Sequence, residues 1–245
     1  MANLIVDEGN TLCKIAVVDK SEVLYEWSDK EFDMAKASEL VEQFSIDKAI
    51  VASTRGGAEK ICEQLGSKVA KVLHFTSQTE VPIEIEYSSR QTLGADRIAV
   101  AVGVVCEMGI ESALVVDMGS AITYDIIENG VFKGGNISLG VAMRFRALHE
   151  FTASLPLCQA TEPNGAFGKS TQEAIEQGVM QGILYEIEGY VEKISATNAK
   201  KCIIFCGGDA ESFVNRIKSA IFAPRKLMFT GLNRILEYNV SKNNI

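Results

Sequence analysis

Short apolar runs alternate with polar turns along the first half of the chain, a pattern typical of α/β domains. Apolar or alternating segments predict strands at 3–7, 13–19, 22–27, Ala49–Ala52, Val69–Phe75 and Ile83–Tyr87. Apolar residues at helical spacing predict helices at 34–44, Gly56–Leu65 and Asp96–Met108. The last of these helices is apolar on nearly every side, which suits the seam between two domains.

The second half of the chain repeats this opening order. Three strands are predicted at Ala113–Asp117, Ile122–Ile127 and Val131–Lys133, with Asn129-Gly130 as a hairpin turn between the last two. They are followed by a helix at 141–150, a loop at Phe151–Gly168, a helix at Thr171–Ser195, a strand at Cys202–Cys206 and a helix at Asp209–Ser219. The recurrence predicts a tandem duplication of α/β domains, 1–110 and 111–245, with the ligand in the crevice between them.

Composition limits the partners of this chain. Its 245 residues are 47% hydrophobic and 23% charged, as in ordinary soluble globular proteins. No window approaches the roughly 18 consecutive apolar residues of a membrane helix, and we find no signal-peptide pattern, so no membrane partner is expected. The six scattered cysteines are interpreted as reduced, mostly buried thiols, which favours a cytoplasmic location.

The net charge of −8 argues against a nucleic-acid partner, because no stripe of Lys and Arg is present to displace counterions. The same charge does not argue against ATP. An anionic ligand that binds together with Mg²⁺ needs only local donors, and these can lie inside an acidic protein.

Two matching segments, Leu4–Asp19 and Leu114–Glu128, carry the candidate chemistry. Each is an apolar strand that ends in an aspartate, Asp7 or Asp117, and continues through a Gly-containing turn into a second strand. A carboxylate at such a turn can hold hydrated Mg²⁺, while the backbone N–H groups of the turn face phosphate oxygens. A β-hairpin with a polar tip would explain one segment alone; recurrence favours a nucleotide triphosphate held from both sides.

The first turn continues with further phosphate-binding groups. Gly9 permits an unusual backbone conformation and a close approach of phosphate. Asn10 and Thr11 add donors, and Lys14 on the returning strand supplies a point charge. In the second turn Gly119, Ser120 and Thr123 occupy comparable places.

Gly94-Ala95-Asp96-Arg97 opens the predicted apolar helix. An aspartate at a helix start is ordinarily a cap. The functional interpretation is a general base that accepts a hydroxyl proton as oxygen attacks phosphorus. Arg97 would pair with a substrate carboxylate or with phosphate charge, and Tyr87 would close over the same pocket. Thr171 begins the long helix, where capping is its default explanation.

Taken in order over the whole chain, these residues resemble type III pantothenate kinase. The matching motifs are Asp7-x-Gly9-Asn10-Thr11…Lys14, Gly94-x-Asp96-Arg97, Asp117-x-Gly119-Ser120-Ala121-x-Thr123, Gly134-Gly135-Asn136-Ile137, and Thr171 after a Gly-Lys pair. The resemblance implies a duplicated actin/Hsp70/sugar-kinase-like fold, two α/β domains with a nucleotide cleft between them. It also implies ATP-dependent phosphorylation of pantothenate to 4′-phosphopantothenate, the first step of coenzyme A biosynthesis. A homodimer that uses Mg²⁺ with ATP and a monovalent cation, K⁺ or NH₄⁺, is expected on the same ground.

The resemblance also assigns roles to residues. Asp96 would be the catalytic base. ATP would be bound by Asp7, Glu8, Gly9, Asn10, Thr11, Leu12, Cys13, Lys14 and Ser120. Pantothenate would be bound by Tyr87, Gly94, Ala95, Asp96, Arg97 and Thr171, the last of these in the site of the neighbouring subunit. Asp117 would contact the monovalent cation, and Asp7 would hold Mg²⁺ through water.

Three departures from the family pattern stand out: Glu8 replaces an aliphatic residue, Ser120 replaces threonine, and Leu139 stands where proline is usual. Glu8 would either weaken ATP binding or add a metal ligand, and the sequence leaves both open. One alternative function is a catalytically weak or non-enzymatic regulatory relative, although Lys14, Asp96 and Asp117 are all retained. The other is a kinase of the same fold that acts on another small hydroxylated substrate.

Overall fold

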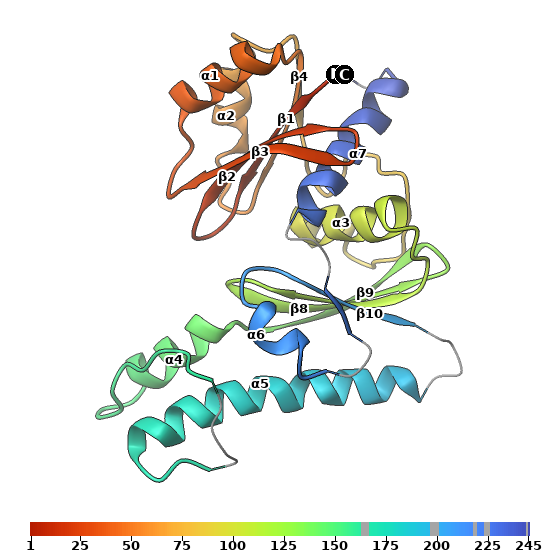
Figure 1. Ribbon diagram of the computed structural model, residues 1–245. Helices are drawn as coiled ribbons and strands as arrows, with labels where there is room; N and C mark the ends of the chain where they lie inside the picture. Colours follow the sequence, from red (N-terminus) through yellow and green to blue (C-terminus); the bar gives the residue numbers. More distant parts are fainter. Residues whose placement is uncertain (163–166, 197–200, 218–219, 223–225, 244) are drawn as a thin grey trace. The chain divides into compact units, whose positions relative to one another are not determined.

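A computed structural model of the chain describes residues 1–162, 167–196, 201–217, 220–222, 226–243 and 245 (Figure 1). The chain forms two compact units. Unit 1 comprises Met1–Glu111, Glu128–Lys133 and Lys226–Ile245, and unit 2 comprises Ser112–Ile127 and Gly134–Arg225. Each unit is built from segments that are not contiguous in the sequence. The division into domains 1–110 and 111–245 stays a prediction.

A five-stranded sheet forms the centre of unit 1, in the order β3-β2-β1-β4-β5. Its strands are β1 (Asn3–Glu8), β2 (Cys13–Asp19), β3 (Glu22–Asp29), β4 (Lys48–Ser53) and β5 (Lys71–His74). β1, β2 and β3 form an antiparallel meander, whereas β4 runs parallel to β1 and β5 runs parallel to β4. Because β1 is central, its residues Leu4, Ile5 and Val6 are fully buried, and their continuous apolar run reflects a strand covered on both faces.

Helices cover both faces of this sheet (Figure 1). Helices α1 (Met34–Phe44) and α2 (Ala58–Leu65) cover one face, and α3 (Ala95–Val102) and α7 (Leu227–Ser241) cover the other. Between these elements the chain adds β6 (Glu84–Ile85) and the short helix η1 (Arg90–Thr92), and a π-helical turn, η2 (Gly103–Glu107), continues α3. Glycine lets α3 and α7 touch through their backbones, since a Cβ atom at Gly231 would overlap the carbonyl oxygen of Ala99.

The second sheet repeats the strand order of the first. Its strands are β7 (Ala113–Met118), β8 (Ala121–Glu128), β9 (Val131–Leu139), β10 (Cys202–Cys206) and β11 (Ala220–Phe222). Their order, β9-β8-β7-β10-β11, matches β3-β2-β1-β4-β5 element by element, and β6 adds one strand beyond β9. The predicted duplication is therefore confirmed at the level of topology.

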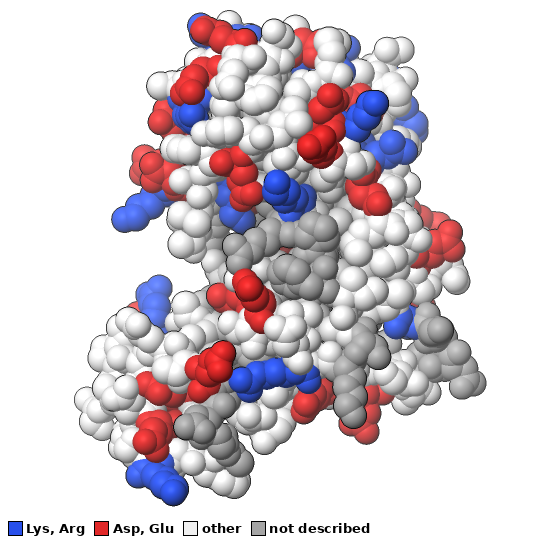
Figure 2. Space-filling model, in the orientation of Figure 1, with Lys and Arg blue, Asp and Glu red and all other residues white. Residues whose placement is uncertain are grey.

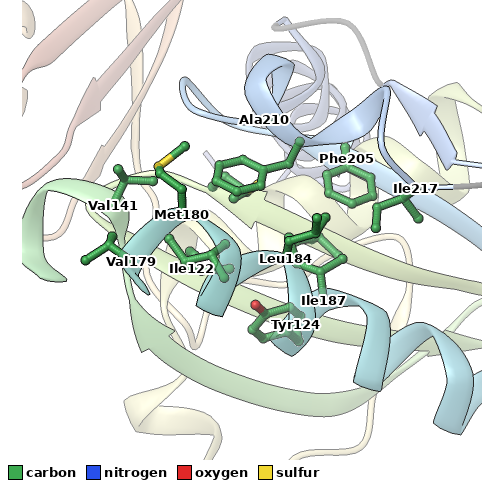
Figure 3. Packing of buried hydrophobic residues seen from close by; sticks show 14 of the residues in the cluster. Ile122, Tyr124, Val141, Val179, Met180, Leu184, Ile187, Phe205, Ala210 and Ile217 are labelled. Atoms are coloured by element: carbon green, nitrogen blue, oxygen red, sulfur yellow. The ribbon is translucent and has the colours of Figure 1, made fainter. Parts of the chain in front are cut away.

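The core of unit 2 lies between this sheet and the long helix α5 (Thr171–Ser195). In Figure 3 the side chains of Ile122 and Tyr124 on β8 and of Phe205 on β10 gather with Leu184 and Ile187 of α5. Ile122, Phe205 and Ile187 are fully buried. Each such side chain contributes about 1.5–3 kcal/mol through its removal from water. Helix α4 (Val141–Glu150) and the short α6 (Glu211–Val214) complete the unit.

Some elements differ from the expectations. The helix expected at Asp96–Met108 is α-helical only to Val102. The helix expected at Asp209–Ser219 is reduced to α6, and residues 218–219 lie outside the described part of the chain. Strand β9 runs to Leu139 rather than stopping near residue 133, because Gly135 allows its backbone to approach that of Tyr124 more closely than a Cβ atom would permit.

Two surface properties bear on partners. Among the described residues no helix has both the length and the apolarity to cross a membrane. On the face drawn in Figure 2, Lys and Arg are interspersed with Asp and Glu.

Candidate active site

The first candidate site lies at the carboxyl end of β1 in unit 1. Asp7 is directly opposite Lys14 in the β1–β2 register and is 6% exposed. Burial raises the pKa of Asp7 to about 6, Lys14 opposes this shift, and the charges of Asp96 and Glu8 add to it. Lys14 thus lies opposite Asp7, and Asp96 is near enough for its charge to act on Asp7. A buried carboxylate beside other acids is suited to binding Mg²⁺ that arrives with a ligand. The cation would offset the negative charge of the clustered acids.

The turn after Asp7 is compact and open to solvent. The N–H group of Gly9 donates to the carbonyl oxygen of Leu12 at 2.9 Å, which closes the turn. Asn10, Thr11 and Leu12 are exposed at its tip. Cys13, which follows, is buried, and burial raises the pKa of its thiol to about 12. Cys13 therefore packs as a neutral side chain, and the turn offers backbone and hydroxyl donors to a ligand.

Asp96 lies in the first turn of α3. Its Oδ1 atom accepts a hydrogen bond from the backbone N–H group of Arg97 at 2.8 Å. A Cβ atom at Gly94 would overlap that same oxygen, so glycine at residue 94 makes room for the carboxylate. Asp96 is half-buried, which leaves it accessible to a substrate hydroxyl.

Arg97 is buried between two aromatic rings. Its guanidinium carbon lies 5.8 Å from the centre of the Tyr87 ring and 5.6 Å from that of Phe132. The two rings are tilted against each other with centres 6.2 Å apart. Cation–π contacts of this kind fix the guanidinium group without neutralising its charge. Arg97, which directly follows Asp96 in the chain, is thus held with its guanidinium group against both rings.

The second candidate site lies at the carboxyl end of β7 in unit 2. The thiol of Cys206 donates a hydrogen bond to Asp117, and burial raises the thiol's pKa far above its usual value. Gly207 has a φ of +91°, and a Cβ atom there would come within 2.5 Å of Asp117 Oδ1 and would overlap the carbonyl oxygen of Met118. The backbone at Gly207 is therefore packed directly against the carboxylate of Asp117 and the carbonyl group of Met118.

Ser120 follows in the same turn and is exposed. Gly119 donates its N–H group to the carbonyl oxygen of Ala121 at 3.0 Å. The chain at Gly140, which precedes α4, presses against this turn so closely that a Cβ atom there would overlap the carbonyl oxygens of Gly119 and Ser120. The backbone of the turn is therefore packed against Gly140, while the Ser120 side chain is exposed to solvent.

Protein groups alone do not build a complete metal site in the part of the chain that the structure describes. No group of three or more His, Cys, Asp or Glu side chains there is arranged to hold an ion. Mg²⁺ would be held by Asp7 together with phosphate oxygens and water, in keeping with its usual coordination in phosphate sites.

Thr171 opens α5, but the cap of that helix is Ser170, whose hydroxyl accepts from the N–H group of Glu173 at 3.2 Å. Thr171 instead lines a largely apolar groove of about 860 Å³ between α4 and α5, together with Leu148, Phe151, Leu155 and Ala174. Phe151 at the rim is 86% exposed.

Sequence reasoning did not predict Phe132 beside Arg97, and it interpreted Cys206-Gly207-Gly208 as either an ordinary turn or a contact for an adenine ring or ribose rather than as a neighbour of Asp117. The hairpin position of Phe132 could be predicted from the sequence, because the residue follows the Asn129-Gly130 turn. Its contact with Arg97 could not be predicted. The Gly207-Gly208 pair after a strand was a visible signal, although its partner Asp117 is 90 residues away.

Comparison with known proteins agrees with this geometry. The family model described as type III pantothenate kinase matches residues 3–193. A curated relative from Bacteroides fragilis, named type III pantothenate kinase, is 40% identical over 97% of this chain and 98% of its own length.

Two solved structures are also similar. A protein from Campylobacter jejuni described as a conserved putative Baf family transcriptional activator shares 26% identity, with a TM-score of 0.65 over 97% of this chain and 99% of its own. The activator of the 2-hydroxyisocaproyl-CoA dehydratase from Clostridium difficile, with bound ADPNP, is 14% identical, with a TM-score of 0.57 over 100% of this chain and 98% of its own. The second likeness concerns the fold alone, and with the duplicated sheets it confirms the actin/Hsp70/sugar-kinase-like architecture. The chain belongs to the type III pantothenate kinase family.

Proposed function

We propose that this pantothenate kinase transfers the γ-phosphoryl group of Mg²⁺-ATP to the primary hydroxyl group of pantothenate, with Asp96 as the general base. The hydroxyl oxygen attacks the γ-phosphorus in line, its proton passes to the Asp96 carboxylate, and the bond to the bridging oxygen breaks to release ADP. The observation that carries the proposal is the proximity of Asp96 to Asp7, close enough for the charge of one to raise the pKa of the other.

In this proposal the Asp7–Lys14 turn binds the phosphates. Lys14 and the exposed donors of Asn10 and Thr11 stabilise the charge of the transferring group, and Asp7 holds Mg²⁺ through water. The Ser120 hydroxyl of unit 2 is proposed as a further phosphate contact. Positioning and electrostatics supply most of the catalysis, since phosphoryl transfer needs little covalent work from the protein.

Arg97 is proposed to bind the pantothenate carboxylate. Its guanidinium group is fixed by the Tyr87 and Phe132 rings and stays charged at all working pH values. With Gly94 and Ala95 it orients the substrate so that the hydroxyl group lies near Asp96.

Asp117 is proposed to contact a monovalent cation, K⁺ or NH₄⁺. The proposal rests on the family resemblance at Asp117, whose Oδ1 atom and the carbonyl oxygen of Met118 both lie against Gly207. Such an ion supplies positive charge near the phosphates when bound.

We also propose a cytoplasmic homodimer. The apolar groove between α4 and α5, with Phe151 at its rim, is the surface that a second copy would cover. Thr171 lines that groove, and the family resemblance assigns it to the substrate site of the neighbouring subunit. The cytoplasmic location rests on six cysteines that are all free thiols.

The test is ADP release by the purified protein with Mg²⁺, K⁺, ATP and pantothenate. Asp96→Asn is expected to abolish turnover while the thermal unfolding temperature stays unchanged, because the amide keeps the shape of the side chain but accepts no proton. Near wild-type turnover in this variant would remove Asp96 as the base. A panel of other small hydroxylated acceptors tests the substrate, since pantothenate would give no ADP above background if another alcohol were the acceptor.

A further inference from the structure

We propose that Glu8 is a positioning residue of the phosphate-binding turn and not a metal ligand. It fixes the turn by binding the N-terminal end of helix α2. The proposal rests on the proposed role of the Asp7–Lys14 turn in binding ATP. It concerns the residue at which this chain departs from the aliphatic side chain usual at that position.

Strand geometry sends Glu8 and Asp7 to opposite faces of the sheet. Successive side chains of a strand alternate. Leu4 and Val6 belong to the apolar cluster formed with α1 and α2, so Glu8 points to that side. Asn3, on the other side, donates to Asn233 of α7 at 2.8 Å, and Asp7 shares that side. The Glu8 carboxylate is therefore directed away from the metal-binding face that Asp7 occupies.

The carboxylate of Glu8 is bound by the turn that joins β4 to α2. The hydroxyl group of Ser53 donates to Glu8 Oε2 at 2.5 Å, and the N–H group of Gly57 donates to the same oxygen at 3.1 Å. The backbone of Glu8 is bound as well, because the N–H group of Thr54 donates to its carbonyl oxygen at 2.9 Å. One residue of the phosphate-binding turn is thus held through both its side chain and its main chain.

Helix α2 supplies the reason for this contact. Its N-cap residue is Gly57, which has no side chain to bind the free N–H groups of the first turn. The N–H group of Gly57 donates both to Glu8 Oε2 at 3.1 Å and to Ser53 Oγ at 3.2 Å, and the negative charge of Glu8 lies at the positive end of the helix dipole. Glu8 thus binds a helix N-cap residue that lies 49 positions later in the chain.

The charge of Glu8 is also compensated locally. The Arg55 guanidinium group lies 3.6 Å from Glu8 Oε1 and donates to the carbonyl oxygen of Lys30 at 3.0 Å. The carboxylate therefore has an ion-pair partner, a hydroxyl donor and a backbone donor without a metal. These partners reduce, but do not remove, the effect of its negative charge on Asp7.

Gly57 is matched to Glu8 in shape. A Cβ atom at residue 57 would lie 2.7 Å from Glu8 Oε1 and would overlap Oε2. No atom outside the Glu8 carboxylate is among its three nearest neighbours. An alanine at residue 57 would therefore push the Glu8 side chain out of its place, and removal of that carboxylate would relieve the three closest contacts of the added methyl group.

The experiment measures the dissociation constant of Mg²⁺-ADPNP by calorimetry, and the KM values for ATP and pantothenate, in four variants. Glu8→Ala and Gly57→Ala are each expected to weaken ADPNP binding by roughly tenfold, the effect of misplacing a binding group, and to raise KM for ATP but not for pantothenate. Glu8→Gln keeps an acceptor oxygen and is expected to recover most of the affinity. Glu59→Ala, which removes an exposed carboxylate from the same helix end, is the matched control and leaves binding unchanged.

The double variant Glu8→Ala/Gly57→Ala decides the mechanism. If Gly57→Ala acts through the Glu8 carboxylate, the double variant binds ADPNP no more weakly than Glu8→Ala alone. Additive losses would overturn the positioning role, and so would wild-type affinity in both single variants. A change in the Mg²⁺ dependence of binding in Glu8→Gln would instead identify Glu8 as a metal ligand.

Lys14→Ala separates this inference from the function on which it rests. Weaker ADPNP binding in Lys14→Ala with wild-type binding in Glu8→Ala would overturn the inference and leave the phosphate-binding turn intact. Unchanged binding in Lys14→Ala would instead remove the proposed function of the turn.

Discussion

Gly94 and Asp96 are so close that a Cβ atom at residue 94 would overlap the Oδ1 atom of Asp96. The backbone of Gly94, at φ −57° and ψ 133°, is one that alanine adopts freely. The requirement for glycine is therefore set by the neighbouring carboxylate and not by the local conformation.

This contact predicts a variant that loses activity without losing stability. In Gly94→Ala the Asp96 side chain must rotate away, and a base displaced by about 1 Å costs on the order of a hundredfold in kcat. The unfolding temperature should stay within a few degrees of wild type. Gly189→Ala, at a site where a Cβ atom meets nothing within 4 Å, is the control for both measurements. Wild-type kcat in Gly94→Ala would show that the placement of Asp96 does not matter.

The raised pKa of Asp7 predicts a pH-dependent stability. The folded state holds the Asp7 proton more tightly than the unfolded chain, because burial raises the pKa from 3.8 to about 6. Ionised Asp7 therefore destabilises the fold above pH ~6, by about 3 kcal/mol at full effect. Asp7→Asn should unfold at higher urea concentration than wild type at pH 7.5, and the difference should vanish near pH 4. An equal gain at both pH values would contradict the assignment.

The same group predicts a pH dependence of activity. Asp7 must be ionised to hold Mg²⁺ through water, so kcat/KM for ATP should fall as the pH drops through about 6. The dependence of kcat should be weaker, since bound Mg²⁺ favours the ionised form. The measurement is a pH–rate profile at limiting and at saturating ATP. A kcat/KM for ATP that stays level down to pH 5 would contradict this role.

Gly207 predicts how the second site responds to cations. Gly207→Ala would strain a backbone with a φ of +91° and crowd Asp117 Oδ1, so we expect a loss of roughly 1–3 kcal/mol in stability and a higher K⁺ concentration for half-maximal activity. Gly109→Ala shares the positive φ, +67°, but faces open space, and it should lose stability alone. An unchanged K⁺ requirement in Gly207→Ala would separate this site from the cation.

Phe132 predicts a selective effect on the acceptor substrate. Phe132→Leu keeps an apolar side chain of similar volume but removes the ring 5.6 Å from the Arg97 guanidinium carbon. We expect KM for pantothenate to rise about three- to tenfold with KM for ATP unchanged, as the loss of one cation–π contact implies. Phe145→Leu in the core of unit 2 is the matched control for lost packing. Equal effects of both variants on KM for pantothenate would mean that Phe132 only packs.

The sequence predicted the two buried strands that end in Asp7 and Asp117, but not their central place in each sheet. The apolar runs before Asp7 and Asp117 are local signals, and a buried strand needs no distant partner to be recognised. The roles of Phe132 and Cys206 were not predictable in this way. Phe132 meets Arg97 because β6 pairs with the start of β9, and Cys206 meets Asp117 because β10 lies parallel to β7. Both pairings join segments far apart along the chain.

Glu8 illustrates the same limit. Its position beside Asp7 suggested a metal ligand or a repulsive charge, because the sequence shows neighbours but not faces. The alternation of β1 and the uncapped start of α2 give it a different set of partners. Site residues carried over from the family pattern remain predictions to be tested by the variants above.

The shared strand order of the two sheets also has an evolutionary consequence. Asp7 faces Lys14 across its hairpin, whereas Asp117 faces Thr123 at the corresponding rung. After a duplication, the residues around one copy of the aspartate can change while the other copy keeps its original role. A basic neighbour in one hairpin and a neutral hydroxyl group in the other give the two equivalent carboxylates different electrostatic surroundings within one chain.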